Sequence, residues 1–309
     1  MAQRRCCATL TCFREGGLTV KVLITGATGQ VGRALLRSAP HQVELCALAR
    51  DQLDLCDPSA IRRAIAAVQP AVIINAAAYT AVDAAESEQA LAYAVNAEGP
   101  RHLAEAVQAI PRCRLLHIST DYVFDGRADA PYAPGATAHP LNVYGHSKLL
   151  GEQAVLQVLG ERALVLRTAW VYSTEGRNFL LTMLRLMREH GAVRVVSDQY
   201  GTPTTADSIA RALWRLAELP RIGGILHWTD DGAVSWCQFA RAIAEDARGA
   251  GVLTREVQVT PIATADYPTA ARRPARSVLD TREAAAQMGL QPIHWRESLR
   301  ATLAKLSCG

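Results

Sequence analysis

Three glycines at three-residue intervals, Gly26, Gly29 and Gly32, constrain this chain more than any other feature of its sequence. They follow an apolar, mostly β-branched run at residues 20–25 and open a segment with helical periodicity at residues 30–38. Glycines in such a turn let backbone N–H groups approach a diphosphate, and the helix N-terminus favours its negative charge. The segment therefore predicts a strand, a tight turn and a helix that together bind a dinucleotide.

The following residues repeat this alternation. Asp57 and Pro58 are typical of a helix N-cap and of the first helical position. Strands are expected at 43–47, 71–75, 113–119 and 163–167, and helical segments at 58–68, 86–109 and 143–159. Alternation at this spacing predicts the α/β class, with a doubly wound parallel sheet of the Rossmann type.

Beyond Thr168 the pattern is less regular. Helices are expected at 179–189, 207–217, 236–247, 281–288 and 295–306, and strands at 193–197 and 224–227. We therefore predict an NAD(P)-binding Rossmann domain at 20–170, completed by about 193–227. A smaller, interleaved C-terminal substrate-binding domain is predicted at 171–192 and 228–309, and residues 1–19 are predicted to be a flexible extension.

Composition restricts the classes of partner. The 309 residues carry a formal net charge of +4 without long runs of one sign, so no basic run in the sequence indicates binding to nucleic acid. No apolar run is long enough to cross a bilayer. The cysteines show no C-x-x-C pair and favour reduced thiols, hence a cytoplasmic protein; they are Cys6, Cys7, Cys12, Cys46, Cys56, Cys113, Cys237 and Cys308.

Cofactor contacts are expected beyond the glycine loop, where Gln30 and Val31 open the helix. The second strand has no carboxylate at its tip and is followed by Arg50, which favours NADPH and leaves NADH open. Arg50 as an ordinary solvated charge is the alternative. Asp54 and Leu55 fit a contact around the adenine, and Ala76, Ala77 and Ala78 after the third strand are small enough for backbone to lie against the cofactor.

Tyr144 and Lys148 are one helical turn apart and predict a catalytic pair. An ammonium beside a phenol lowers the pKa of the phenol, which helps it to act in acid–base catalysis. Thr120 ends a strand at the carboxyl edge of the sheet and can donate to a carbonyl oxygen. Tyr144 as an ordinary helix residue is the alternative, but the order of glycine loop, alanines, Thr120 and the Tyr144–Lys148 pair favours a reductase.

At these residues the chain resembles the dTDP-4-dehydrorhamnose reductases, which are extended short-chain dehydrogenases/reductases. The resemblance covers the chain from about Val20 to its end. The matching segments are 29–32, 75–83, 119–126, 140–145, 167–172, 178–179, 182–186, 198–204, 235–236, 273–274 and 277–280. The segments around Thr120 and Asp198 are specific to the family, whereas the glycine loop and the Tyr144–Lys148 pair are more widespread.

The resemblance implies an NAD(P)H-dependent oxidoreductase that reduces the C4 ketone of dTDP-4-dehydro-6-deoxy-L-mannose to dTDP-L-rhamnose, the last step of dTDP-rhamnose biosynthesis. Tyr144 would protonate the alkoxide, Lys148 would lower the Tyr144 pKa and Thr120 would polarise the ketone. Tyr79 and Thr80 would join the cofactor site. The nucleotide-sugar would contact Val82, Thr120, Asp121, Tyr122, Trp170 and Arg273, with Arg276 as an alternative to Arg273 for the diphosphate.

Some members of the family dimerise around magnesium held by glutamates. The helix after the glycine loop has no carboxylate at the corresponding place, and Glu297 alone does not make a magnesium site. We therefore expect no structural metal and leave monomer or homodimer open.

Other functions remain compatible with these residues. The sugar could be another nucleotide-linked 4-keto-6-deoxyhexose, because epimers differ by the placement of one hydroxyl. A related subfamily is the regulatory subunit of methionine adenosyltransferase, which binds NADP without turnover. The presence of Thr120, Tyr144 and Lys148 favours the enzyme.

Overall fold

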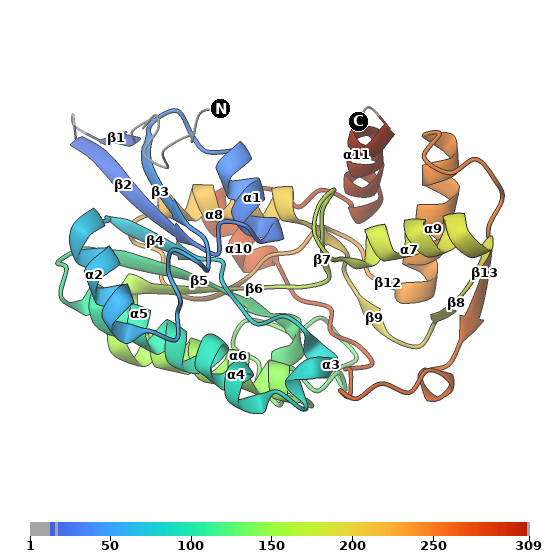
Figure 1. Ribbon diagram of the computed structural model, residues 1–309, viewed down its shortest axis with the longest axis horizontal. Helices are drawn as coiled ribbons and strands as arrows, with labels where there is room; N and C mark the ends of the chain where they lie inside the picture. Colours follow the sequence, from blue (N-terminus) through green and yellow to red (C-terminus); the bar gives the residue numbers. More distant parts are fainter. Residues whose placement is uncertain (1–12, 16–17, 308–309) are drawn as a thin grey trace.

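A parallel sheet organises the larger part of the chain, as the computed structural model shows for residues 13–15 and 18–307 (Figure 1). Its strands follow the order β3 (Val43–Leu48), β2 (Leu18–Thr25), β4 (Val72–Asn75), β5 (Arg114–Thr120), β6 (Ala163–Thr168) and β11 (Gly224–His227). The chain passes from β2 to β3 on one side and then crosses to β4 on the other. In sheets of this kind, ligands bind at the carboxyl edge where the winding reverses.

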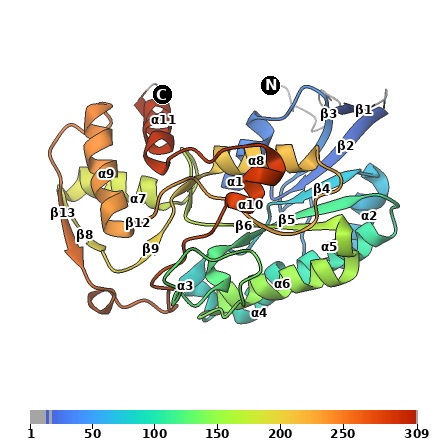
Figure 2. The ribbon, with the colours of Figure 1, turned by 180° about the vertical axis from the view of Figure 1, so that it is seen from behind.

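Helices cover both faces of the sheet, because successive side chains of a buried strand point to opposite sides. Val22 and Ile24 of β2 pack in the same core as α1 (Gln30–Arg37), α8 (Ala206–Ala217) and α10 (Arg282–Met288). Leu23 packs in the core with α2 (Pro58–Val68), α5 (Gly99–Gln108) and α6 (Val143–Leu159). Figures 1 and 2 show these two layers. The predicted doubly wound α/β fold is confirmed.

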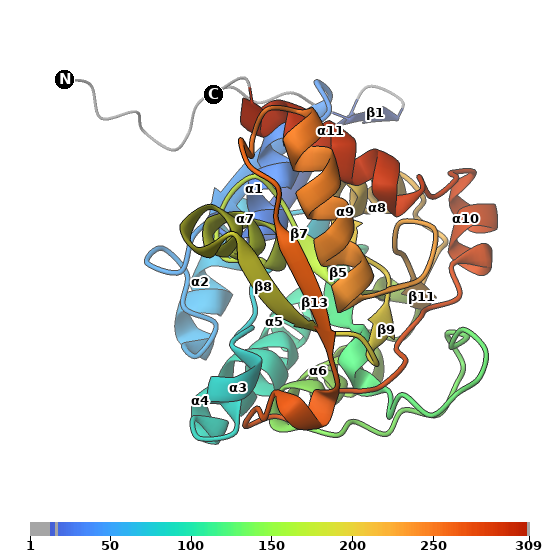
Figure 3. The ribbon, with the colours of Figure 1, turned by 90° about the vertical axis from the view of Figure 1, so that its right-hand side faces the viewer.

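A separate core lies beside the sheet, at the end of the molecule that faces the viewer in Figure 3. It contains α7 (Phe179–His190), α9 (Trp236–Gly249), α11 (Trp295–Ser307) and the parallel strands β8 (Ala192–Val196) and β13 (Gln258–Ile262). Short ladders join β7 (Val171–Tyr172) to β10 (Thr204–Thr205) and β9 (Tyr200–Gly201) to β12 (Val234–Ser235). Within the range 193–227, β11 extends the central sheet and β8 pairs outside it. The domain boundaries stay a prediction.

Most predicted elements lie within two residues of their observed bounds, and the expected N-cap of α2 is present. Asp57 Oδ1 accepts hydrogen bonds from the backbone N–H groups of Ser59 and Ala60. Short 3₁₀ turns are η2 (Asp121–Val123), η3 (Gly160–Arg162) and η4 (Thr264–Asp266).

The helical segment expected at 86–109 is instead interrupted. It consists of α4 (Gln89–Tyr93), the π-helical turn η1 (Ala94–Glu98) and α5, preceded by α3 (Val82–Ala85). Pro100 has no N–H to donate to the carbonyl of Asn96, which disturbs the α-helical hydrogen-bond ladder at this point. The freed carbonyl lies against α6, where a Cβ on Gly151 would be only 2.1 Å from the Asn96 oxygen.

The chain begins its sheet earlier than expected. Strand β2 starts at Leu18 rather than Val20, and β1 (Phe13–Glu15) pairs with it in antiparallel fashion. The remainder of the predicted flexible extension, at 1–12 and 16–17, lies outside the described residues, as do Cys6, Cys7, Cys12 and Cys308.

A buried ion pair fixes α6 to the sheet. Arg167 on β6 donates to Glu152 on α6 at 2.7 Å and 3.0 Å, and these side chains are 3% and 1% exposed. The Arg167 guanidinium also lies over the Phe124 ring, 5.1 Å from its centroid. Since both charges are removed from water, each needs the other.

Arg167→Met should lower the free energy of unfolding by about 3–5 kcal/mol, because it leaves the Glu152 carboxylate buried without its cation. Urea unfolding followed by circular dichroism measures this loss. The double variant Arg167→Met/Glu152→Leu should recover most of it. Arg185→Met, which removes an exposed pair with Glu189, should change stability by no more than about 0.5 kcal/mol. A loss of similar size in both single variants would contradict the special role of the buried pair.

Candidate active site

A cavity of about 540 Å³ lies at the carboxyl edge of the sheet. The loops after β2, β4, β5 and β6 form its walls, together with the start of α6. It brings together most of the residues that the sequence predicts for a site: Gly29, Gln30, Val31, Ala76, Ala77, Ala78, Thr80, Val82, Thr120, Asp121, Tyr122, Tyr144, Lys148 and Trp170.

The glycine loop fits closely against its neighbours. Gly26 has φ +71°, and a Cβ there would lie 2.6 Å from the backbone nitrogen of Ala77. A Cβ on Gly32 would lie 2.2 Å from the Gly26 oxygen. Gly29 is the N-cap of α1 and has no side chain to cap it, so that the first-turn N–H groups remain available to an anion. This cradle suits the diphosphate of a dinucleotide, although Gly26 and Gly32 shape it without lining it.

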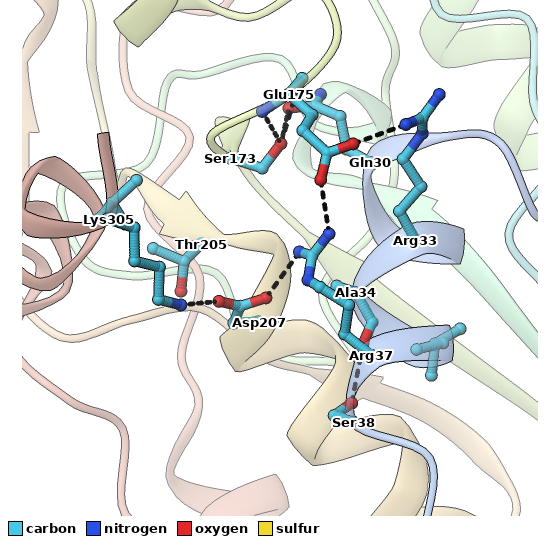
Figure 4. Close-up of polar contacts among 12 residues, drawn as sticks. Gln30, Arg33, Ala34, Arg37, Ser38, Ser173, Glu175, Thr205, Asp207 and Lys305 are labelled. Atoms are coloured by element: carbon cyan, nitrogen blue, oxygen red, sulfur yellow. Dashed lines mark hydrogen bonds and ion pairs between the residues drawn. The ribbon is translucent and has the colours of Figure 1, made fainter. Parts of the chain in front are cut away.

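The side chain of Gln30 fastens a distant loop to this cradle (Figure 4). Its Oε1 accepts from Ser173 Oγ at 3.0 Å and from Asn178 Nδ2 at 2.9 Å. Glu175 of the same loop forms ion pairs with Arg33 at 2.6 Å and Arg37 at 2.8 Å. The loop at 173–178 is therefore held against α1.

Two residues of this loop, Gly176 and Arg177, line the cavity next to Gly29 and Gln30. No sequence motif indicates either residue as part of a site. Nothing in the local sequence marks Arg177, because its position depends on a contact with α1, more than 140 residues away.

Several predicted cofactor residues lie outside the cavity. Arg50 is exposed after β3, and the Asp54 carboxylate accepts from the backbone N–H of Cys56 at 3.0 Å. Leu55 is buried in the hydrophobic core. The Tyr79 hydroxyl donates to Glu88 at 2.9 Å. The proposed contacts of these four residues with a cofactor stay predictions.

Asn96 is a further residue that the sequence analysis missed. It lies in the π-helical turn and is fully buried. Its amide accepts from the backbone N–H of Tyr79 at 2.8 Å and donates to the Tyr79 carbonyl at 2.9 Å. Asn96 also donates to Ser147 Oγ on α6 at 3.1 Å. It thereby positions the loop that carries Thr80 and Val82 into the cavity.

The start of α6 places Tyr144 and Lys148 against the end of β5. Asn142 caps the helix by accepting from the Gly145 N–H at 2.8 Å. A Cβ on Gly145 would lie 2.1 Å from the Tyr122 oxygen, so α6 packs directly on η2. The Tyr144 phenol and the Thr120 hydroxyl line the same cavity, and Thr120 acts to lower the pKa of the phenol. A ketone oxygen in this cavity could therefore meet both hydroxyls.

Electrostatics of the pair differ from the sequence prediction. Burial raises the pKa of Tyr144 to about 12, with the hydrogen bond to Thr120 acting in the opposite direction. Burial lowers the pKa of Lys148 to about 8. The rise of the Tyr144 pKa comes from burial of the phenol, and Lys148 Nζ donates to the Ile118 carbonyl at 2.7 Å. Tyr144 therefore keeps its proton at neutral pH, the form that protonates an alkoxide. The lowering of the Tyr144 pKa by Lys148 once a cofactor is bound stays a prediction.

Some polar atoms of the cavity have no hydrogen-bond partner among the residues that the structure describes. They are Ser119 Oγ, Asp121 Oδ2 and Thr168 Oγ1. Asp121 is 2% exposed, and burial raises its pKa to about 7. Buried polar atoms normally have partners, so these atoms favour a ligand with several hydroxyl groups.

Two stacked indoles form one wall of the cavity. The rings of Trp170 and Trp236 are parallel to within 2° with centroids 3.3 Å apart. Trp170 adopts φ +46°, a strained conformation for a residue with a side chain. A Cβ on Gly201 would lie 2.5 Å from the Trp170 ring. Trp236 opens α9, so the separate core contributes to this wall, which the sequence analysis did not foresee.

A second cavity of about 500 Å³ adjoins the first, and Tyr122 and Trp236 line both. Arg273 lies in this second cavity and forms a two-pronged ion pair with Asp83 at 2.7 Å and 3.0 Å. Arg276, the alternative to Arg273, lines neither cavity and forms a backbone bridge with Tyr200.

No group of three or more His, Cys, Asp or Glu side chains within residues 13–15 and 18–307 is placed to hold a metal ion. Glu297 is exposed on α11. The absence of a structural metal stays a prediction. In the same described residues, no helix is both long and apolar enough to span a membrane.

Comparison with known proteins gives consistent matches. The family described as RmlD substrate binding domain matches residues 20–308. A dTDP-4-dehydrorhamnose reductase of Mycobacterium tuberculosis is 44% identical over 295 residues, covering 93% of this chain and 94% of that protein. A probable dTDP-4,6-dihydroxy-2-methyloxan-3-one 4-ketoreductase of Streptomyces antibioticus is 42% identical over 285 residues, covering 90% and 92%.

A solved structure supports the same relationship. The dTDP-4-dehydrorhamnose reductase of Bacillus anthracis, in complex with NADP, superposes with a TM-score of 0.87 at 33% identity. The superposition covers 93% of this chain and 100% of that one.

Gly201→Ala should displace the Trp170 ring from Trp236, because the added Cβ would lie 2.5 Å from the indole. We expect a changed near-ultraviolet circular dichroism signal in the tryptophan region. Gly135→Ala is the matched control, since a Cβ there meets nothing within 4 Å. An unchanged spectrum in Gly201→Ala would mean that the stack tolerates the new side chain.

Proposed function

The chain belongs to the RmlD family, whose relatives are dTDP-4-dehydrorhamnose reductases, and we propose that it reduces dTDP-4-dehydro-6-deoxy-L-mannose to dTDP-L-rhamnose with NADPH. The observation that carries this proposal is the meeting of Thr120, Tyr144 and Lys148 in one cavity with the glycine loop. When bound, NADPH supplies the hydride that reaches C4 of the sugar.

The chain's own residues handle the ketone oxygen. Thr120 donates a hydrogen bond that polarises the carbonyl, and Tyr144 donates its phenolic proton as the oxygen becomes an alkoxide. Both hydroxyls line the same cavity, which supports this assignment. Lys148 lies one turn further along α6 and would bind the nicotinamide ribose.

The two adjoining cavities suit the two parts of a nucleotide-sugar. The first offers a sugar the unpartnered oxygens of Asp121, Ser119 and Thr168 and the wall formed by Trp170. The second offers a nucleoside diphosphate the guanidinium of Arg273. Tyr122 at the junction would contact both parts.

Two different parts of the cofactor would meet different arginines. Arg177 lies beside the glycine loop and would face the diphosphate, which NADPH and NADH share. Arg50 follows β3, where the 2′-phosphate that distinguishes NADPH is usually bound.

A second candidate function changes the sugar and keeps the chemistry. The Streptomyces antibioticus ketoreductase, which acts on a different 4-keto sugar by its name, is about as similar to this chain as the rhamnose enzyme is. Overall identity therefore does not select the sugar. The regulatory alternative, binding NADP without turnover, is disfavoured by the assembled Thr120, Tyr144 and Lys148. Cytoplasmic location and a monomeric or homodimeric state stay predictions.

Tyr144→Phe should lower kcat by roughly 10²–10⁴-fold, because the alkoxide loses its positioned proton donor. The measurement follows the loss of reduced-nicotinamide absorbance with NADPH and dTDP-4-dehydro-6-deoxy-L-mannose. NADPH binding by the variant, measured by fluorescence, serves as the folding control. Faster consumption of another 4-keto sugar would select the second candidate, and binding of NADPH without oxidation of any of these sugars would select the regulatory one.

Arg50→Ala should lower kcat/KM for NADPH relative to NADH by roughly tenfold, the value of one lost charge-assisted hydrogen bond. Arg177→Ala should lower kcat/KM for both cofactors by a similar factor, since both carry the diphosphate. Steady-state kinetics with each cofactor distinguish these effects. An unchanged NADPH to NADH ratio in Arg50→Ala would remove Arg50 from the cofactor site.

A further inference from the structure

The amine of Lys148 is enclosed by groups whose hydrogen-bonding roles can be worked out. It is 2% exposed, and its Nζ lies 2.7 Å from the Ile118 oxygen and 3.3 Å from His117 Nε2. Tyr144 lies one turn before it on α6 and Glu152 one turn after it. Glu152 is paired with Arg167 of β6, and Asp121 lies on η2 at the same cavity.

Asn75 at the end of β4 has a fixed orientation. Its Oδ1 is 3.2 Å from the backbone nitrogen of Ala77 and 2.6 Å from Thr25 Oγ1. A backbone N–H can only donate, so the atom facing Ala77 must be the amide oxygen. The Nδ2 group of Asn75 therefore faces His117, 2.9 Å from its Nδ1.

This orientation determines the tautomer of His117. Nδ1 must accept from Asn75, so the neutral ring carries its proton on Nε2. Burial lowers the pKa of His117 well below its usual value, so the ring stays neutral. The Nε2–H group then faces Lys148 Nζ.

We propose that Asn75 and His117 are positioning residues that favour the neutral amine of Lys148 over its ammonium before a cofactor binds. The lone pair of the Lys148 nitrogen accepts from His117, one N–H donates to Ile118, and a second N–H remains for the cavity. An ammonium at this position has no lone pair, so its N–H groups would face the Nε2–H group of His117 and no hydrogen bond could form between them. Burial acts in the same direction and lowers the pKa of Lys148 to about 8, so the neutral amine becomes the main form above about pH 8. The inference concerns the chain without substrate, so it is independent of which sugar is reduced.

The functional consequence is a proton linkage. A cofactor whose ribose hydroxyls accept hydrogen bonds from Lys148 favours the ammonium, so binding would be coupled to proton uptake. The network from Ala77 to Lys148 starts at the loop after β4, where a cofactor would lie, and ends at the catalytic helix.

The sequence makes a direct test practical, because the chain has only three lysines, Lys21, Lys148 and Lys305. Lys21 and Lys305 are surface residues with ion-pair partners. In protein labelled with ¹³C-lysine, NMR titration should give one midpoint clearly below the others. That signal should be missing in Lys148→Arg. In ¹⁵N-histidine protein, His117 should show the Nε2–H tautomer and no protonation near neutral pH.

Asn75→Asp is the decisive variant, because its carboxylate keeps the contacts with Ala77 and Thr25 but can only accept from His117. His117 should then move its proton to Nδ1, and the Lys148 midpoint should rise by about one pH unit or more. Thr25→Val is the matched control: it loses one hydrogen bond to Asn75 but keeps the Ala77 contact, so tautomer and midpoint should not move.

An Nδ1–H tautomer in the wild type would overturn the proposal, and so would an unmoved Lys148 midpoint in a folded Asn75→Asp variant. If that variant does not fold, the wild-type tautomer decides. None of these measurements needs substrate, so failure here is distinguishable from failure of the proposed reduction.

Discussion

The close approach of α6 to the backbone on either side of it is the constraint on which the site depends. Gly145 meets the Tyr122 carbonyl and Gly151 meets the Asn96 carbonyl at distances that leave no room for a Cβ. Tyr144 directly precedes Gly145, and Lys148 lies between Gly145 and Gly151 on the helix. The catalytic pair therefore keeps a fixed position relative to Thr120 at the end of β5. The buried pair of Arg167 and Glu152 fixes the next turn of the same helix to the sheet.

Local sequence patterns predicted the features that depend on neighbouring residues alone. Strand and helix positions followed from alternation and caps, as at Asp57, and the glycine loop marked the switch point of the sheet. The π-helical turn within the helical segment expected at 86–109 could not be predicted from periodicity. It depends on the missing N–H of Pro100 and on how α6 packs against Asn96. Local sequence patterns therefore predicted the helices and strands but not the π-helical turn that packs against α6.

The sequence indicated the site residues that belong to short motifs. It did not indicate those that distant segments bring to the site in the folded chain. Tyr144, Lys148 and Thr120 share a cavity, as their motifs indicated, although their roles stay proposals. Trp236 and Arg177 reach the same cavity from distant segments, and no spacing could reveal that. The rise of the Tyr144 pKa could not be predicted either, because it comes from burial of the phenol in the tertiary structure.

The fastening of the loop at 173–178 to the glycine-loop helix has a consequence for exchange of the bound dinucleotide. Part of the fastening is an ion-pair chain through Glu175, Arg37, Asp207 and Lys305, whose side chains are 39% to 59% exposed (Figure 4). Dissolved ions weaken such exposed pairs far more than they weaken an apolar core. Ionic strength thus acts on the loop at 173–178 while leaving the sheet intact. A dinucleotide bound beside this loop should therefore dissociate faster at high salt concentration before the fold loosens.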